Sequence, residues 1–239
     1  MLLIQVLLQA VIALIVIMVA YIVLAAVFFG KEIRSAMERD PAATSPLEII
    51  LTYSGFHAIV IHRLASALHR AKISLMPRLI SQIGKFITGI EIHPGAKIGR
   101  GLFIDHGMGV VIGETSILGN NVTLFQGVTL GGTGKERGKR HPTLGNNVVV
   151  GTGAKVLGNI HVGDNVSIGA NAVVIRDVPP NSTVVGVPGR VAKKEGKKRP
   201  GINLDHTSLP DPLANALDRL QHEIDKIETD IKNWHKSKG

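Results

Sequence analysis

The sequence predicts a mainly β chain. Its centre is a parallel β-helix of six-residue repeats, preceded by a short α-helical region and an N-terminal transmembrane helix and followed by a C-terminal α-helix. Three observations lead to this prediction. An aliphatic residue recurs every six positions between Ile92 and Val178, residues 2–29 are almost wholly apolar, and a heptad pattern occupies the C-terminal end.

The six-residue repeat is clearest in its second half, which reads LGNNVV, VGTGAK, VLGNIH, VGDNVS, IGANAV and VIRDVP. The first position of each unit is aliphatic: Leu144, Val150, Val156, Val162, Ile168 and Val174. The fifth position is apolar and small or medium-sized: Val148, Ala154, Ile160, Val166, Ala172 and Val178. A period of six suits a parallel β-helix, in which three units of one short strand and one corner close a turn. We expect the residue at the first position to point inward and the residue at the fifth position to fill the corner. Gly and Asn between them are expected to adopt left-handed backbone conformations.

Two interruptions break the period. The phase slips by two residues between Val110 and Ile112, and a non-repeating stretch runs from Gly131 to Thr143. Because a repeat by itself is only a scaffold, function is expected at the residues that interrupt it.

The first element, residues 1–30, is predicted to be a transmembrane anchor. Its apolar run exceeds the roughly 20 residues that cross a bilayer as a helix, and no Lys or Arg precedes it. Lys31, Arg34 and Arg39 follow, so the positive-inside rule places the rest of the chain at the cytoplasmic face of the membrane. A helix buried in an oligomer and an uncleaved signal-like segment are the alternatives.

The next elements follow in chain order. Residues 31–90 are predicted to be helical, with breaks at Asp40-Pro41 and near Pro46, a helix from Pro46 to His69 and a second through Pro77–Ile87. Residues 91–191 form the β-helix, and residues 192–210 form a basic linker that contains the run KKEGKKR.

The last element, residues 211–239, is predicted to be a heptad helix that begins at Asp211-Pro212. Apolar residues recur in steps of four and three: Leu213, Leu217, Leu220, Ile224, Ile227, Ile231 and Trp234. In a parallel homo-oligomer Glu223 and Glu228 would face each other and repel. Self-association, packing on the chain's own body and binding of another partner therefore stay open.

Composition narrows the function classes. The chain has 239 residues and no Cys, which excludes disulfides, a cysteine metal site and a thiol acyl-enzyme. The formal net charge of +9 invites a nucleic-acid interpretation. The basic residues gather in short runs without aromatic neighbours, so we expect a solvated linker or contact with anionic lipid and no nucleic-acid partner.

Four polar clusters intrude on the apolar design. They are Glu91-Ile92-His93-Pro94, Asp105-His106-Gly107, the stretch from Thr129 to Gly134 with the loop KERGKRHP behind it, and Asp40-Pro41-Ala42. A carboxylate and an imidazole in place of ordinary turn residues indicate acid–base chemistry.

These clusters carry a resemblance. From about Met37 to Arg190 the chain reads ERDPAA, GFHA, IHPGAKIGRG, DHGMGVVIGET, TLGGTG, RHP, GAKVLGNI and GVPGR, in that order. It resembles the serine acetyltransferases, within the hexapeptide-repeat acyltransferase superfamily. The resemblance implies left-handed β-helices in a homotrimer or dimer of trimers, with active sites between subunits. It also implies transfer of acetyl from acetyl-CoA to the hydroxyl of L-serine, giving O-acetyl-L-serine for cysteine biosynthesis, with no metal.

The resemblance also implies residue roles. His106 matches the catalytic histidine, and Glu91 stands where the family has the aspartate paired with it. Asp40, Asp105, Arg140 and His141 match residues that bind serine. Gly132 and Thr133 lie where the CoA arm passes, and Gly151 and Thr152 would line the same groove. The resemblance implies O-acetylserine sulfhydrylase as a possible partner. The chain ends KSKG, without the apolar terminal residue that inserts into that partner in bacterial members, and this ending argues against the complex.

Three alternatives stay open. The same enzyme class acting on a sugar or another small acceptor would need neither Arg140 nor Asp105 as a clamp. A solenoid scaffold at the membrane would bind no acetyl-CoA. A γ-type carbonic anhydrase would need three converging histidines, which His93, His106, His141 and His161 do not clearly supply.

Overall fold

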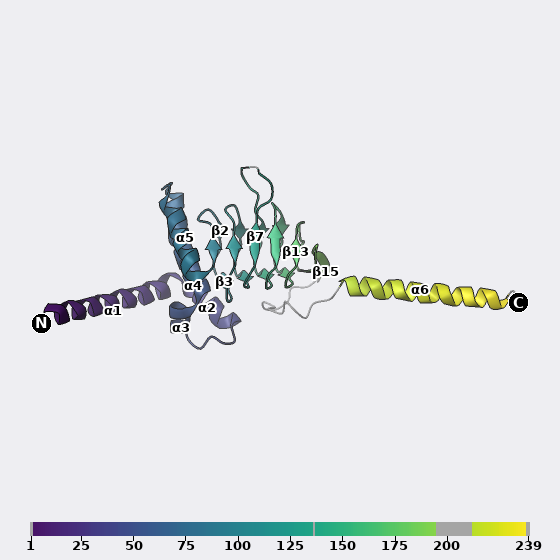
Figure 1. Cartoon of the computed structure of the whole chain (residues 1–239), viewed down its shortest axis with the longest axis horizontal. Coiled ribbons are helices and arrows are strands. Elements are labelled where there is room, and N and C mark those ends of the chain that lie inside the picture. The colour runs from purple at the N-terminus through teal and green to yellow at the C-terminus, as the bar shows by residue number, and fades with distance from the viewer. Residues whose placement is uncertain (1, 136, 195–211, 238–239) are drawn as a thin grey trace.

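The structure is a computed structural model that describes residues 2–135, 137–194 and 212–237. Within these ranges helices come first, then a coil of short strands, then a last helix that extends away from the coil (Figure 1). The helices are α1 (Leu2–Phe28), α2 (Gly30–Arg39), α3 (Pro46–Thr52), α4 (Ser54–Arg70), α5 (Met76–Thr88) and α6 (Pro212–Ser237).

The coil has three sheets, which we name A, B and C. Sheet A has the order β1-β4-β7-β10-β13 and contains Glu91–Ile92, Val111–Ile112, Thr129–Gly131, Lys155–Leu157 and Val173–Val174. Sheet B has the order β11-β8-β5-β2 and contains, from β2, Lys97–Ile98, Ile117–Leu118, Thr143–Leu144 and His161–Val162. Sheet C has the order β15-β14-β12-β9-β6-β3 and contains, from β3, Phe103–Ile104, Thr123–Leu124, Val149–Val150, Ser167–Ile168, Ser182–Val185 and Arg190–Lys194.

The chain visits the sheets in the order A, B, C and then returns to A one level higher. Successive levels pair in parallel, as in Ile112↔Leu130 and Val156↔Val174. The first residues of the repeat units, from Leu144 to Val174, are buried, as the six-residue pattern predicted. We call the corners where the chain turns from one sheet to the next the A–B, B–C and C–A edges.

The B–C edge shows why Asn recurs in the repeat. Asn121, Asn147, Asn165 and Asn181 all have a positive φ between 55° and 58°. The side-chain amides of the first three each donate to the amide oxygen one level up, at 3.2, 3.0 and 2.9 Å. The short polar side chain tolerates the left-handed conformation and continues the ladder between levels.

The two interruptions of the period are visible as longer corners. β4 begins at Val111, eight residues after the start of β3 at Phe103, where the regular spacing is six. β8 begins at Thr143, fourteen residues after the start of β7 at Thr129. The first insertion lies at the C–A edge and the second at the A–B edge.

The helices before the coil pack against its first turn. Ala58 and Ile59 of α4 belong to the same buried cluster as Ile90 and Ile92 of the coil. α5 ends at Thr88, and its C-cap residue Gly89, with a φ of 71°, turns the chain into β1.

One helix differs from its prediction. The sequence predicts a continuous helix from Pro46 to His69, but α3 ends at Thr52 and α4 begins at Ser54. Tyr53 between them is extended, with φ −80° and ψ 110°, and its hydroxyl reaches Asp40 at 2.6 Å. A second feature was missed: β14 and β15 form an antiparallel hairpin beyond the last repeat. Of the predicted basic linker, residues 195–210 lie outside the described residues.

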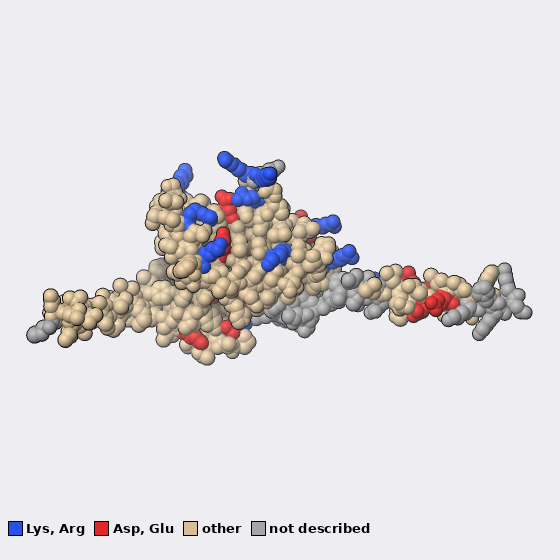
Figure 2. Space-filling model, viewed as in Figure 1, with Lys and Arg blue, Asp and Glu red and all other residues tan. Residues whose placement is uncertain are grey.

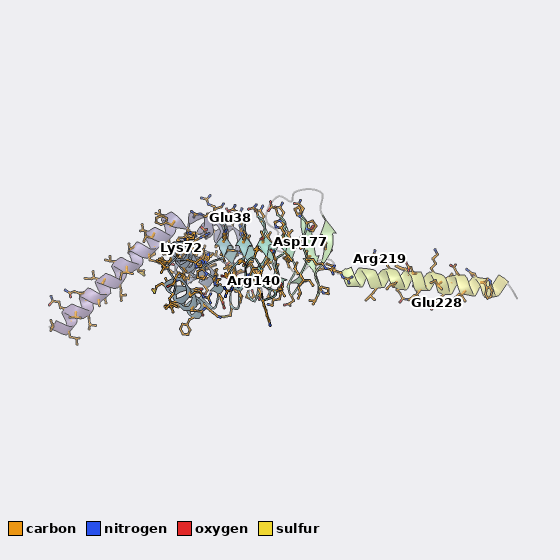
Figure 3. The ribbon with its side chains drawn as sticks, turned by 90° about the horizontal axis from the view of Figure 1, so that it is seen from above. Glu38, Lys72, Arg140, Asp177, Arg219 and Glu228 are labelled. Carbon is orange, nitrogen blue, oxygen red and sulfur yellow. The ribbon has the colours of Figure 1, made fainter. Side chains whose placement is uncertain are left out.

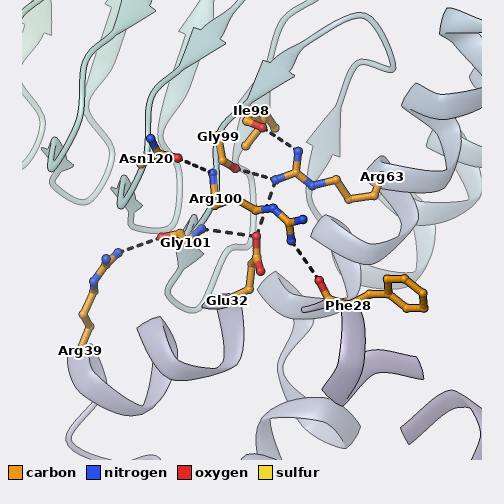
Figure 4. Close-up of polar contacts among 9 residues, drawn as sticks. All are labelled: Phe28, Glu32, Arg39, Arg63, Ile98, Gly99, Arg100, Gly101 and Asn120. Atoms are coloured by element: carbon orange, nitrogen blue, oxygen red, sulfur yellow. Dashed lines mark hydrogen bonds and ion pairs between the residues drawn. The ribbon is translucent and has the colours of Figure 1, made fainter. Parts of the chain in front are cut away.

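Arginines tie the helices to the coil (Figure 4). Arg63 of α4 donates to the carbonyl oxygens of Ile98 and Gly99 at 2.6 and 2.5 Å. Arg100 donates to the carbonyl oxygen of Phe28 at the end of α1, at 3.0 Å. Cations at the last carbonyl of a helix are electrostatically favourable, so this contact holds the C-terminal end of α1 at the base of the coil.

The basic residues after α1 have different surroundings. Lys31 and Arg34 are exposed, as a membrane-proximal position requires. Arg39 is buried instead, and its guanidinium donates to the carbonyl of Val122 and the hydroxyl of Thr123 at 3.3 and 3.1 Å. Arg39 therefore binds the coil, unlike Lys31 and Arg34.

The two terminal helices expose apolar residues. α1 has 27 residues, carries no charged side chain and is largely exposed, so its length and composition would allow it to cross a membrane (Figure 2). The heptad residues of α6 from Leu217 to Trp234 are 50–58% exposed. Among the seam residues whose side chains the structure describes, Leu217 to Trp234, none is buried against the chain's own body.

Candidate functional site

A pocket of about 290 Å³ lies at the C–A edge, where α3 and α4 meet the first turn of the coil. It brings together Asp40, Asp105 and His106, three of the predicted site residues. The other lining residues are Thr52, Tyr53, Ser54, Gly55 and Ile104. The sequence separates Asp40 from Asp105 by more than sixty positions, so the packing of the helices on the coil creates this site.

The two-residue insertion presents His106 to solvent. His106 has a φ of 55° and Gly107 a φ of 81°, so the corner is left-handed over two residues. The His106 side chain is 73% exposed, and its Nε2 lies 3.9 Å from Oδ1 of Asp105. An exposed imidazole at the rim of a pocket is accessible to a substrate hydroxyl.

Asp40 is held in place by two hydrogen bonds. Its Oδ2 accepts from the hydroxyl of Tyr53 at 2.6 Å, and its Oδ1 accepts from the N–H of Ala42 at 2.8 Å. Burial, and the hydrogen bond to Asp40, raise the pKa of Tyr53 well above its ordinary value. Tyr53 therefore stays protonated and keeps donating to the carboxylate.

Glu91 lies on β1 and forms an ion pair with Lys85 of α5, with 2.5 Å between Nζ and Oε2. Among the described residues no hydrogen bond or ion pair joins Glu91 to His106. The expected pairing of these two residues is therefore not formed in the single chain, and the role of Glu91 stays a prediction.

A second group lies at the A–B edge, around the loop after β7. Arg140 forms an ion pair with Glu114, with 2.6 Å between Nη2 and Oε2. The Arg140 hydrogen bond keeps the pKa of the Glu114 carboxyl below its ordinary value. His141 is buried beside it, and burial, with the positive charge of Arg140, lowers the pKa of His141.

The backbone around Arg140 and His141 is fixed by one hydroxyl. Oγ1 of Thr115 accepts from the N–H groups of Arg140 and His141 at 3.0 and 3.1 Å. It also lies 2.9 Å from Nδ1 of His141. Neither Glu114 nor Thr115 was among the predicted site residues, although both belong to the triplet GET at the end of the motif DHGMGVVIGET.

The four predicted CoA-arm residues divide between the edges. Gly132 and Thr133 lie beside Arg140, and the N–H of Thr133 donates to the Arg140 carbonyl at 3.3 Å. Gly151 and Thr152 lie at the C–A edge, on the same side of the coil as His106 and two levels above it. A single chain therefore does not bring all four into one groove.

The two groups are also separate. His106 lies just before strand β4 of sheet A, and Arg140 lies after strand β7 of the same sheet. The two residues are therefore at opposite margins of sheet A. In Figure 3 Glu38, which is two residues from Asp40, lies at the upper margin of the coil, whereas Arg140 lies lower, over the coil itself. Lys and Arg side chains stand out above α5 and the loop after β7, with acidic side chains between them (Figure 2). Among the described residues no group of three or more His, Cys, Asp or Glu is arranged to hold a metal ion.

The sequence matches one family model and is similar to known serine acetyltransferases. The family model described as bacterial transferase hexapeptide (six repeats) matches residues 141–176. A serine acetyltransferase of Bacillus subtilis is 57% identical over 203 residues, covering 85% of this chain and 93% of the relative. One from Staphylococcus aureus is 57% identical over 195 residues, covering 82% and 91%.

Solved structures agree with the sequence relatives. The serine acetyltransferase of Vibrio cholerae superposes with a TM-score of 0.72 at 39% identity, covering 74% of this chain and 69% of that one. That of Neisseria gonorrhoeae in complex with serine gives 0.67 at 42%, covering 69% and 67%. That of Brucella abortus in complex with coenzyme A gives 0.68 at 42%, covering 71% and 68%. The repeat, the parallel sheets and these neighbours fit a left-handed β-helix, and the chain belongs to the serine acetyltransferase family.

Proposed function

We propose that this chain transfers acetyl from acetyl-CoA to the hydroxyl of L-serine, giving O-acetyl-L-serine and CoA. The observation that carries the proposal is the pocket that joins His106 to Asp40 and Asp105 in a member of the serine acetyltransferase family. Relatives solved with serine and with coenzyme A support both substrates.

His106 is proposed as the general base. Its exposed imidazole takes the proton of the serine hydroxyl while the hydroxyl oxygen attacks the carbonyl carbon of the thioester. The carbon–sulfur bond then breaks, and the imidazolium returns the proton to the departing thiolate. Glu91 is proposed to orient His106 from the start of the coil.

The ammonium and the carboxylate of the substrate serine need binding groups of opposite charge. Asp40 and Asp105 are proposed to hold its ammonium beside His106, because Tyr53 keeps the Asp40 carboxylate aimed into the pocket. Arg140 and His141 are proposed to hold its carboxylate. A guanidinium has five N–H donors, so the hydrogen bond from Arg140 to Glu114 leaves others for the substrate.

A complete site then needs two copies of the chain. The two groups lie at opposite margins of sheet A, so a closed ring of copies with sheet A toward the axis places one copy's His106 beside the next copy's Arg140. We propose a homotrimer, or a dimer of trimers, with these shared sites. Gly132 and Thr133 of one copy and Gly151 and Thr152 of the next would then line one channel for the CoA arm.

We also propose that α1 anchors the enzyme in a membrane with the coil at the cytoplasmic face. The helix is long, apolar and uncharged, and exposed Lys31 and Arg34 follow it. Extraction of membranes at high pH tests this proposal, because a peripheral protein is released and an anchored one is retained.

The test of the activity is an acceptor panel. The chain is mixed with acetyl-CoA and L-serine, L-threonine, L-homoserine or a sugar, and free CoA is followed with a thiol reagent. We expect L-serine to support CoA release far better than the others, and we expect His106→Ala to abolish it. CoA release that prefers a sugar, or no release at high serine concentration, would contradict the proposal.

A further inference from the structure

The hydroxyl of Thr115 has a fully determined set of hydrogen bonds. It accepts from two backbone N–H groups, those of Arg140 and His141. A hydroxyl has two lone pairs and one hydrogen. Since both lone pairs are occupied, the hydrogen is left for the third neighbour, Nδ1 of His141 at 2.9 Å.

This arrangement fixes the tautomer of His141. Nδ1 accepts from the Thr115 hydroxyl, and the N–H of Thr115 also points at it from 3.3 Å. A nitrogen that accepts hydrogen bonds carries no hydrogen in the neutral ring, so the hydrogen lies on Nε2. Burial and the neighbouring cations Arg140 and Lys139 lower the pKa of His141 against the opposing effect of Glu114, so the ring is a neutral Nε2–H donor.

The ring is also closely packed against two glycines. A Cβ added at Gly113 would lie 1.9 Å from Cδ2 of His141, and one added at Gly132 would lie 3.1 Å from Cε1 and Nε2. The imidazole therefore fills the space between two glycines. Its orientation is set by packing and its hydrogen by Thr115.

We propose that Thr115 is a positioning residue, which fixes His141 as an Nε2–H donor to the substrate carboxylate and sets the backbone of Arg140 beside it. This inference rests on the proposed function. Without the hydroxyl, only the longer hydrogen bond from the N–H of residue 115 favours the Nε2–H tautomer. More of the rings then carry their hydrogen on Nδ1, and the lone pair of Nε2 opposes a carboxylate.

The experiment compares three substitutions in the full-length enzyme. Thr115→Val removes the hydroxyl and keeps the shape, while Thr115→Ser keeps the hydroxyl. Thr143→Val is the matched control, because Thr143 is half-buried on sheet B two residues after His141 and its hydroxyl makes no hydrogen bond among the described residues. Thr115→Ala repeats the hydroxyl loss with a smaller side chain, so the test does not depend on one variant folding.

We expect Thr115→Val to raise the KM for serine about tenfold, the size of one lost hydrogen bond to a charged group, with the KM for acetyl-CoA nearly unchanged. The unfolding midpoint should fall as well, because the N–H groups of Arg140 and His141 lose their acceptor. Thr115→Ser and Thr143→Val should stay close to the unchanged enzyme. The pH dependence separates a tautomer effect from a structural one. A protonated imidazole carries hydrogens on both nitrogens, so the KM ratio of Thr115→Val to the unchanged enzyme should shrink as pH falls from 8 to 6.

Each failure has its own meaning. An unchanged serine KM in both Thr115→Val and Thr115→Ala, a deficit that does not change with pH, or an equal deficit in Thr115→Ser would overturn the role of Thr115. Absence of serine-dependent CoA release by the unchanged enzyme would overturn the proposed function itself.

Discussion

Replacing Gly113 by Ala tests whether His141 contacts serine. The added Cβ would lie 1.9 Å from Cδ2 and 2.1 Å from Nε2 of His141, whereas ordinary van der Waals contact begins at 3.4 Å. The ring must therefore retreat by about 1.5 Å, the difference between 3.4 and 1.9 Å. His141 is buried, so the movement also breaks its hydrogen bonds with Thr115.

The expected cost follows from that displacement. A misplacement of about 1 Å at a reacting centre reduces a rate by roughly 100-fold, so we predict a fall of about that size in kcat/KM for serine. Forcing an extra carbon into a packed site also lowers the free energy of unfolding, by about 1–3 kcal/mol. The KM for acetyl-CoA should change much less, because His141 is assigned to the serine carboxylate.

The assay measures CoA release at varied serine and at varied acetyl-CoA, together with urea unfolding. Gly30→Ala is the matched control, since its Cβ would meet nothing within 4 Å and its φ is not positive. A Gly113→Ala enzyme that keeps its kcat/KM for serine within threefold would show that His141 does not act where we place it.

Three further predictions concern the pocket and the helices. His106→Ala should lower kcat by about 100- to 10,000-fold with little change in either KM, measured by CoA release. Tyr53→Phe removes the donor 2.6 Å from Asp40 and should raise the KM for serine about tenfold without changing that for acetyl-CoA. Burial lowers the pKa of His62 to about 3 from 6.5. Between these two pH values His62 is protonated in the unfolded chain and neutral in the folded chain. Stability is therefore complete above pH 6.5 and falls below it by up to about 1.4 kcal/mol per pH unit, which urea unfolding at pH 7.5 and 5.5 should show and His62→Gln should flatten.

The repeat was readable from the sequence because each unit contributes the same positions to the core. The residues from Leu144 to Val174 are buried where the period places them. The departures from the period were equally informative, since the two insertions carry Asp105, His106 and Arg140.

Contacts between levels of the coil were not readable in the same way. Thr115 reaches Arg140 and His141 across 25 and 26 residues, through the packing of one level on the next. The apolar spacing predicted one helix from Pro46 to His69, but the chain leaves the helical conformation at Tyr53, whose hydroxyl binds Asp40. These contacts depend on side-chain geometry that no periodicity encodes.

Glu91 shows a further limit of the sequence. Its position matched a partner for His106, but helix α5 brings Lys85 to the same carboxylate. A motif places Glu91 at the start of the coil, whereas the side chain that binds its carboxylate depends on which helix packs beside it.

The shared site is tested most directly by mixing two inactive enzymes. His106→Ala and Arg140→Ala are each expected to lack activity, whether expressed alone or mixed without exchange of subunits. When they are co-expressed, a site can combine the intact His106 of one copy with the intact Arg140 of the next, so we expect about one quarter of the sites to regain activity for random assembly. Co-expressed enzyme that assembles into mixed oligomers yet stays inactive would contradict the account.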